Sequence, residues 1–113
     1  MKISFDQQLS KLPSPATEKW PEGIWFNEAW RQGEMSLELY APKNRDYQTP
    51  HSQDELYVVV RGRGTFQLET EQIEFAPGDV LIVPAGKVHR FSQFSGDFAA
   101  WVVFWGPHKV IAK

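Results

Sequence analysis

The stretch "TPHSQDELYVVVRGRG", residues 49–64, combines a strand pattern with side chains that can bind a metal ion. The residues "ELYVVV" favour a β-strand, and the "RGRG" that follows them is typical of a tight hairpin turn. Side chains two apart on a strand share a face, so His51, Gln53 and Glu55 project to one side if the segment is extended throughout. The stretch is therefore either a plain hairpin with a polar lead-in or half of a metal site.

The remainder of the chain follows the same β pattern. Residues 34–41, "EMSLELYA", alternate between apolar and polar side chains, and residues 80–84, "VLIVP", predict a short buried strand that ends at the proline. Roughly seven to nine short strands with turn signals between them predict an all-β sandwich or small barrel. Residues 5–12, "FDQQLSKL", predict one or two helical turns before Pro13.

Composition limits the kind of protein and its partners. The chain has 113 residues, which suit one domain, and no cysteine, which excludes disulfides and thiolate ligands. A net charge of -2 without any basic block predicts no nucleic-acid partner. The longest apolar run, "FAAWVVFW" at residues 98–105, is shorter than the ~20 residues that a membrane-spanning helix needs, and the first residues lack the apolar segment of a secretory signal. We expect a soluble, cytoplasmic protein without a membrane partner.

A second stretch, "PGDVLIVPAGKVHRFSQ" at residues 77–93, can supply a further metal ligand. Pro84 and Gly86 predict a tight bend, and His89 opens the strand that follows the bend. A histidine in this position is well placed to complete a site on a neighbouring strand. Two alternatives stay open: His89 can be a hydrogen-bonded core residue, and Glu55 can pair with an arginine. The candidate arginines are Arg61, Arg63 and Arg90.

Together the two stretches resemble the paired motifs of the cupin family, G-x5-H-x-H-x3/4-E-x6-G and G-x5-P-x-G-x2-H-x3-N. The matching residues are His51, Glu55 and Gly62 in the first motif and Gly78, Pro84, Gly86 and His89 in the second. The resemblance covers roughly residues 34–105. It implies a single cupin domain over residues 1–113 with the fold of a double-stranded β-helix, or jelly-roll barrel, after a short N-terminal helical or irregular segment.

The sequence departs from both motifs. Lys43 stands at the opening glycine of the first motif, Thr49 at its first histidine, and Gln93 at the closing asparagine of the second. Thr49 is a poor replacement for the histidine, because a neutral hydroxyl binds a divalent ion weakly.

The resemblance implies that His51, Glu55 and His89 are metal ligands. We predict that the amide oxygen of Gln53 replaces the missing imidazole, although Gln53 can instead serve only as a hydrogen-bond partner. Two histidines with a carboxylate and an amide suit a divalent ion such as Zn(II), Fe(II), Mn(II) or Ni(II). His108, after a Gly-Pro break, is expected at the surface.

A cupin barrel encloses one small molecule. Aromatic side chains are candidate walls of the cavity, unless they only fill the core: Tyr40, Tyr47, Tyr57, Phe66, Phe91, Trp101 and Trp105. The sequence also resembles small bacterial cupins that accompany aromatic polyketide assembly, as in tetracenomycin biosynthesis. That resemblance implies a small aromatic or polyketide-like ligand.

Three functions follow from the resemblance. The first is a metal-dependent enzyme of the dioxygenase, isomerase or polyketide cyclase type, with Glu55 as the catalytic group that moves a proton. The second is a non-catalytic module that binds a small ligand, and the third is a degenerate structural cupin. A homodimer is expected, because cupins usually pair through β-strands and "GIWFNEAW" (residues 23–30) and "FAAWVVFW" offer apolar edges that would otherwise favour aggregation.

Overall fold

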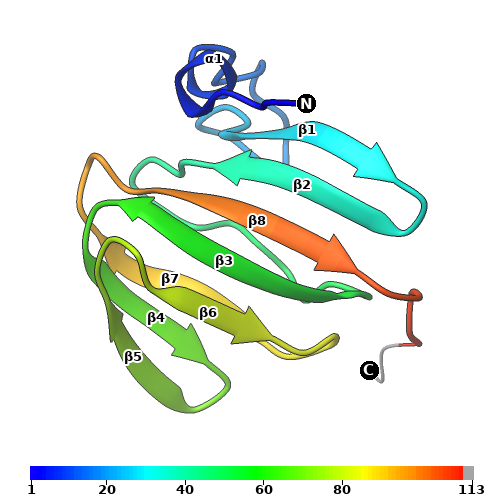
Figure 1. The fold of residues 1–113 in the computed structure, drawn as a ribbon. Helices are drawn as coiled ribbons and strands as arrows, with labels where there is room; N and C mark the ends of the chain where they lie inside the picture. Colours follow the sequence, from blue (N-terminus) through cyan, green and yellow to red (C-terminus); the bar gives the residue numbers. More distant parts are fainter. Residues whose placement is uncertain (111–113) are drawn as a thin grey trace.

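Two antiparallel β-sheets form the body of the molecule (Figure 1), for which a computed structural model describes residues 1–110. The larger sheet has the strand order β1-β2-β8-β3-β6, and the smaller has the order β5-β4-β7. The bounds of the larger sheet are β1 (Phe26–Gln32), β2 (Met35–Tyr40), β8 (Ala99–Trp105), β3 (Asp54–Arg61) and β6 (Val80–Val83). Those of the smaller are β5 (Glu71–Phe75), β4 (Gly64–Leu68) and β7 (His89–Phe94). The structure confirms the all-β jelly-roll prediction, and the short helix α1 (Phe5–Leu9) confirms the N-terminal helical segment.

The core lies between the two sheets and is rich in aromatic rings. Phe91 on β7 is its centre, with ring centroids 5.0 Å from Tyr57 on β3 and 4.7 Å from Phe66 on β4. All three side chains are fully buried. Such ring pairs contribute about 1 kcal/mol each beyond the area they bury, so this cluster holds the sheets together.

The prediction of a hairpin at "RGRG" is wrong. β3 pairs with β6 and β8, whereas β4 pairs with β5 and β7, so residues 62–63 carry the chain from one sheet to the other. Gly62 has φ +91°, and a Cβ there would lie 2.5 Å from Phe98 Cα. The glycine that suggested a hairpin is needed instead for a corner packed against the neighbouring backbone.

The alternation predicted for β2 is present, and its polar face points into the molecule. Ser36, Glu38 and Tyr40 line an internal cavity, while Met35 on the opposite face is 42% exposed. No helix within residues 1–110 is long and apolar enough to cross a membrane.

Candidate metal centre

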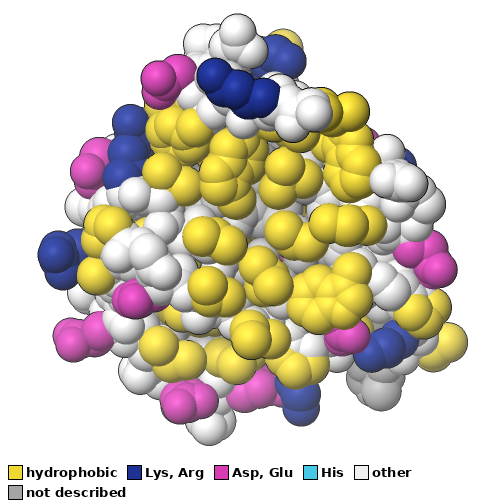
Figure 2. All heavy atoms as spheres, viewed as in Figure 1, with side chains coloured by type: hydrophobic (Ala, Val, Ile, Leu, Met, Phe, Trp, Pro, Cys, Tyr) yellow, Lys and Arg dark blue, Asp and Glu magenta, His cyan; other side chains and the backbone are white. Residues whose placement is uncertain are grey.

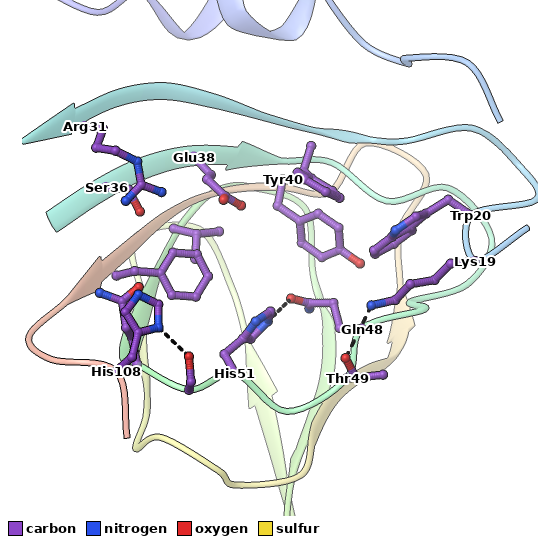
Figure 3. Close-up of a pocket in the computed structure, with 15 residues that line it drawn as sticks. Lys19, Trp20, Arg31, Ser36, Glu38, Tyr40, Gln48, Thr49, His51 and His108 are labelled. Atoms are coloured by element: carbon purple, nitrogen blue, oxygen red, sulfur yellow. Dashed lines mark hydrogen bonds between the residues drawn. The ribbon is translucent and has the colours of Figure 1, made fainter. Parts of the chain in front are cut away.

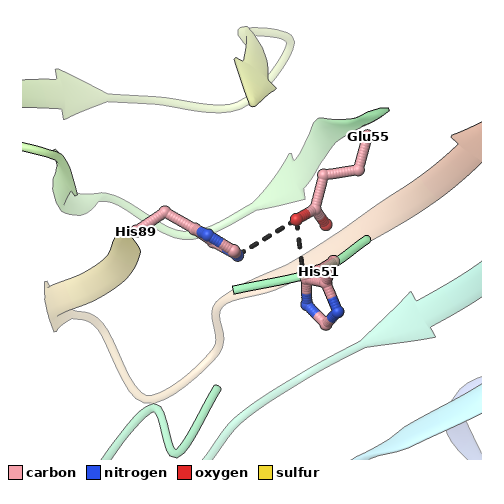
Figure 4. A group of neighbouring side chains, drawn as sticks. All are labelled: His51, Glu55 and His89. Atoms are coloured by element: carbon pink, nitrogen blue, oxygen red, sulfur yellow. Dashed lines mark ion pairs between the residues drawn. The ribbon is translucent and has the colours of Figure 1, made fainter. Parts of the chain in front are cut away.

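The structure brings His51, Glu55 and His89 together from three separate segments (Figure 4). Glu55 lies near the start of β3, His89 begins β7, and His51 lies in the loop before β3. One donor atom from each residue lies within 4.8 Å of the others. Glu55 Oε1 is 3.1 Å from His89 Nε2 and 3.7 Å from His51 Nε2. This arrangement is the one that the two sequence motifs predicted.

Backbone contacts fix the loop and the bend that carry the two histidines. The amide N–H of Gly86 donates to the His51 carbonyl at 2.9 Å, and the amide N–H of Ala85 donates to Asp54 Oδ1 at 2.9 Å. His89 Nδ1 lies 2.9 Å from the Lys87 carbonyl. Because a carbonyl only accepts, Nδ1 carries a proton, which leaves Nε2, the nitrogen that faces Glu55, as the one that could bind a metal ion.

Burial without hydrogen bonds is the strongest sign of a metal site. Glu55 is 0% exposed and His89 is 2% exposed. Among residues 1–110, both carboxylate oxygens of Glu55 and Nε2 of His89 lack a hydrogen-bond partner, since the 3.1 Å approach of the two residues does not have hydrogen-bond geometry. Buried polar atoms without partners cost about 1–3 kcal/mol each. Two nitrogens and a carboxylate that face one point fit a divalent cation of the Zn(II), Fe(II), Mn(II) or Ni(II) type.

The two histidines differ in their electrostatics. Burial is the main cause that lowers the pKa of His51, which favours its neutral, ligating form. Burial also acts to lower the pKa of His89, but the adjacent Glu55 carboxylate outweighs it and raises that pKa above the ordinary value. Within residues 1–110, the ion pairs of Glu55 are with His51 and His89 and not with an arginine.

A cavity of about 280 Å³ opens beside His51 (Figure 3). Its aromatic walls are Trp20, Phe26, Tyr40 and Phe104, and Lys19, Arg31 and Glu38 bring charge to it. The ring of Phe104 packs edge-on against His51, with centroids 5.1 Å apart. His108, expected at the surface, also lines the cavity and contacts the Ser52 hydroxyl.

Most of the predicted aromatic walls were wrong. Tyr40 lines the cavity, but Tyr57, Phe66 and Phe91 belong to the closed core. Trp101 packs against Phe5 of α1 instead. Trp105 and Tyr47 are also absent from the cavity wall. The alternation of a strand shows which residues share a face, but it does not show how far the core fills the space in front of them.

Gln53 is buried beside the cavity, and its amide is engaged with the backbone. Its Nε2 donates to the carbonyls of Glu34 at 2.6 Å and Gly106 at 2.9 Å, which ties the start of β2 to the end of β8. Thr49 accepts a hydrogen bond from Lys19 Nζ. A metal-binding role for Gln53 stays a prediction.

Gln48 and Glu38 are two polar cavity residues near the cluster that the sequence did not single out. Gln48 Oε1 lies 3.2 Å from His51 Nε2 and accepts a 3.0 Å hydrogen bond from Tyr57. Glu38 projects inward from β2, where burial, Glu28 and Glu55 raise the pKa of its carboxyl to about 7. The alternation of residues 34–41 placed Glu38 on the polar face, which was a signal for this residue. Gln48 lies one position before a motif position, and nothing in the sequence indicated its role.

The chain is thus a small antiparallel jelly roll with a candidate metal centre, formed by His51 and the buried residues Glu55 and His89. Residues 36–105 match the model of the cupin domain, and the chain therefore belongs to the cupin family. An uncharacterized protein of Streptomyces coelicolor is 43% identical over 79 residues, which cover 68% of this chain and 75% of that protein.

The chain is also similar to the acireductone dioxygenase of Drosophila pseudoobscura pseudoobscura. The two are 30% identical over 83 residues, which cover 67% of this chain but only 44% of the enzyme. The crystal structure of a cupin-2 domain containing protein from Shewanella frigidimarina has a TM-score of 0.64 at 13% identity, covering 89% of this chain and 91% of that one. This structural likeness concerns the fold alone.

Proposed function

We propose that the chain is a metal-dependent enzyme that acts on a small aromatic or polyketide-like molecule in the cavity beside His51. The observation that carries the proposal is the fully buried Glu55 carboxylate, whose two oxygens lack hydrogen bonds next to His89 Nε2. A purely structural cupin has no reason to retain this charge, because an apolar residue of similar size would avoid the desolvation cost. Similarity to acireductone dioxygenases supports an enzymatic reaction of the dioxygenase type.

His51, Glu55 and His89 would hold the ion. An amide oxygen would fill a fourth position, for which the sequence predicts Gln53. When bound, a divalent ion supplies Lewis acidity to the oxygen groups of a substrate. The chain's own residues orient the substrate and move the proton. Glu55 would bind through one oxygen and hold a proton on the other, because neither oxygen is committed to a hydrogen bond.

The remaining cavity residues suit a flat molecule with polar substituents. Trp20, Phe26 and Phe104 offer ring faces and edges, and Lys19 and Arg31 offer positive charge for a phenolate or carboxylate. The small cavity limits such a molecule to about one or two rings. A non-catalytic module that binds the same ligand is the second candidate, favoured by the absence of the family's first histidine at Thr49.

Metal loading followed by substrate tests examines both candidates. The protein is reconstituted with Fe(II), Mn(II), Ni(II) or Zn(II), and bound metal is measured for the wild type, His51→Ala, His89→Ala and the control His108→Ala. We expect the first two variants to lose the ion and the control to retain it. A panel of phenolic and diketone compounds then separates turnover from binding alone. A wild-type chain that takes up none of the four ions contradicts the proposal.

We also propose a homodimer that forms through the outer face of the larger sheet. Figure 2 shows apolar side chains spread over this face. Strand register aligns Leu37, Val103, Leu56 and Ile82 in one row across β2, β8, β3 and β6. Ile82 is 61% exposed and Trp105 is 36% exposed. A second copy would cover these side chains.

The cytoplasmic location stays a prediction.

A further inference from the structure

The residue next to the missing histidine of the motif lies against the metal centre. Thr49 occupies the motif position, but Gln48 directs its amide towards His51 (Figure 3). We propose that the amide oxygen of Gln48, and not that of Gln53, is the fourth protein donor to the ion. This inference rests on the proposed metal site and adds a ligand to it.

Distances between donor atoms support this assignment. Two ligands that bind one ion at about 2.0–2.2 Å and occupy neighbouring positions stand roughly 3.0–3.5 Å apart. His89 Nε2 and Glu55 Oε1 are separated by 3.1 Å, and Gln48 Oε1 and His51 Nε2 by 3.2 Å. The distance from Gln48 Oε1 to His51 Nε2 is therefore in the range expected for two ligands of one ion, and this nitrogen also faces Glu55.

A buried carboxylate fixes which way the Gln48 amide points. Asp46 is 4% exposed, and it accepts hydrogen bonds from the backbone N–H of Gln48 at 2.9 Å and from Gln48 Nε2 at 3.1 Å. Tyr40 and the backbone N–H of Phe91 also donate to Asp46 and hold it in place. Because both oxygens of Asp46 already accept from backbone N–H groups, they act as acceptors, so the amide nitrogen faces Asp46 and the oxygen faces His51. Such outer partners typically orient metal ligands.

The Gln48 oxygen can bind an ion while it keeps its other contact. An amide oxygen has two lone pairs, of which one accepts the 3.0 Å hydrogen bond from Tyr57. Burial raises the pKa of Tyr57 well above its ordinary value, so its hydroxyl remains a donor. Without an ion, an Nε2–H of His51 can donate to Gln48. Binding of an ion at Nε2 would require the neutral ring to carry its proton on Nδ1 instead. The Gln53 amide is instead oriented by hydrogen bonds from its Nε2 to the backbone carbonyls of Glu34 and Gly106.

Carbon-13 NMR of glutamine side-chain carbonyls tests the assignment directly in the wild-type protein. Zn(II) is titrated into protein labelled at the glutamine Cδ, and single Gln→Asn variants assign the signals. We expect the Gln48 Cδ signal to shift in proportion to bound zinc and the Gln53 signal to stay in place. A shift of Gln53 with a stationary Gln48 overturns the inference, and so does zinc binding that moves neither signal. Absence of zinc binding overturns the metal site as well, so the two failures are distinguishable.

Cobalt(II) affinity and spectra of Gln48→Leu, Gln48→His and the matched control Gln53→Leu add a second readout. Loss of a ligand should weaken binding about tenfold or more and change the visible absorption of bound Co(II). We expect both effects in Gln48→Leu, tighter binding in Gln48→His, and wild-type spectra in Gln53→Leu. If Gln48 only positions His51, Gln48→Leu retains the wild-type cobalt spectrum, and that result refutes the inference.

Discussion

His89 Nε2 and Glu55 Oε1 lie 3.1 Å apart in the buried interior, and neither atom has a hydrogen bond of acceptable geometry. The two residues come from different sheets, since Glu55 belongs to β3 and His89 to β7. The fold therefore buries two polar atoms next to each other without hydrogen bonds, which lowers the free energy of unfolding. That cost is explained if the pair binds an ion that satisfies both atoms.

Replacing Glu55 by glutamine should separate stability from metal binding. The Glu55→Gln variant removes a buried charge, so the free energy of unfolding of the metal-free protein should rise by about 1–3 kcal/mol at a pH where His89 is neutral. The same variant should lose most of its metal affinity, because a neutral amide replaces the only carboxylate of the cluster. Urea denaturation and zinc titration measure the two effects. A variant that is both less stable and fully able to bind zinc contradicts this interpretation.

Glu38 should make the metal-free protein less stable as the pH rises. The pKa of its carboxyl is raised from 4.5 to about 7, first by burial and then by the charges of Glu28 and Glu55, while Arg31 opposes the shift. A raised folded-state pKa gives a stabilising contribution that is complete below pH 4.5 and is lost as the pH rises through about 7. Allowing for solvent at the cavity, the loss amounts to about 2 kcal/mol.

Comparison of the wild type with Glu38→Gln isolates this contribution from those of the histidines. The pKa of His51 is lowered and that of His89 is raised, and both residues are retained in the variant. Urea denaturation at several pH values should show a flatter pH profile for Glu38→Gln. Parallel profiles for the two proteins would show that Glu38 ionises normally.

The sequence predicted the cluster of two histidines and one glutamate but not the direction of the polar side chains around it. The positions of His51, Glu55 and His89 match the spacing of the motifs. This spacing counts residues along the chain, so it does not depend on the local conformation. Gln53 was placed with them by strand alternation, but β3 begins only at Asp54, so alternation does not apply before it. Gln48 lies in the same loop, where only the contacts to Asp46 and His51 reveal its direction.

The sheet arrangement was less predictable than the strands themselves. Strand patterns identify residues that are half-buried, but they do not identify the partner strand. A Gly-x-Gly segment is compatible both with a hairpin turn and with a corner between two sheets. The strand pairing and the packing of Gly62 against Phe98 show that it forms a corner here.

Substitution of Gly62 tests the corner. Gly62→Ala forces a Cβ to 2.5 Å from Phe98 Cα at a positive φ, so the free energy of unfolding should fall by about 2–4 kcal/mol. Gly96→Ala is the control, because its Cβ would meet nothing within 4 Å and its φ is not in the positive range. Urea denaturation should show a near-wild-type midpoint for the control. Equal midpoints for the two variants would argue that the corner relaxes freely.

A charge on the outer face of the larger sheet should separate the proposed homodimer. Ile82 on β6 is 61% exposed and lies beside Leu56 and Val103 in the apolar row. Ile82→Glu places a carboxylate in this row, where a partner subunit would have to desolvate it. Val88→Glu is the control, because Val88 is 55% exposed but lies outside the larger sheet. Light scattering at micromolar concentration should give a dimer mass for the wild type and the control and a monomer mass for Ile82→Glu. A wild-type monomer refutes the dimer, and a dimeric Ile82→Glu moves the interface to another face.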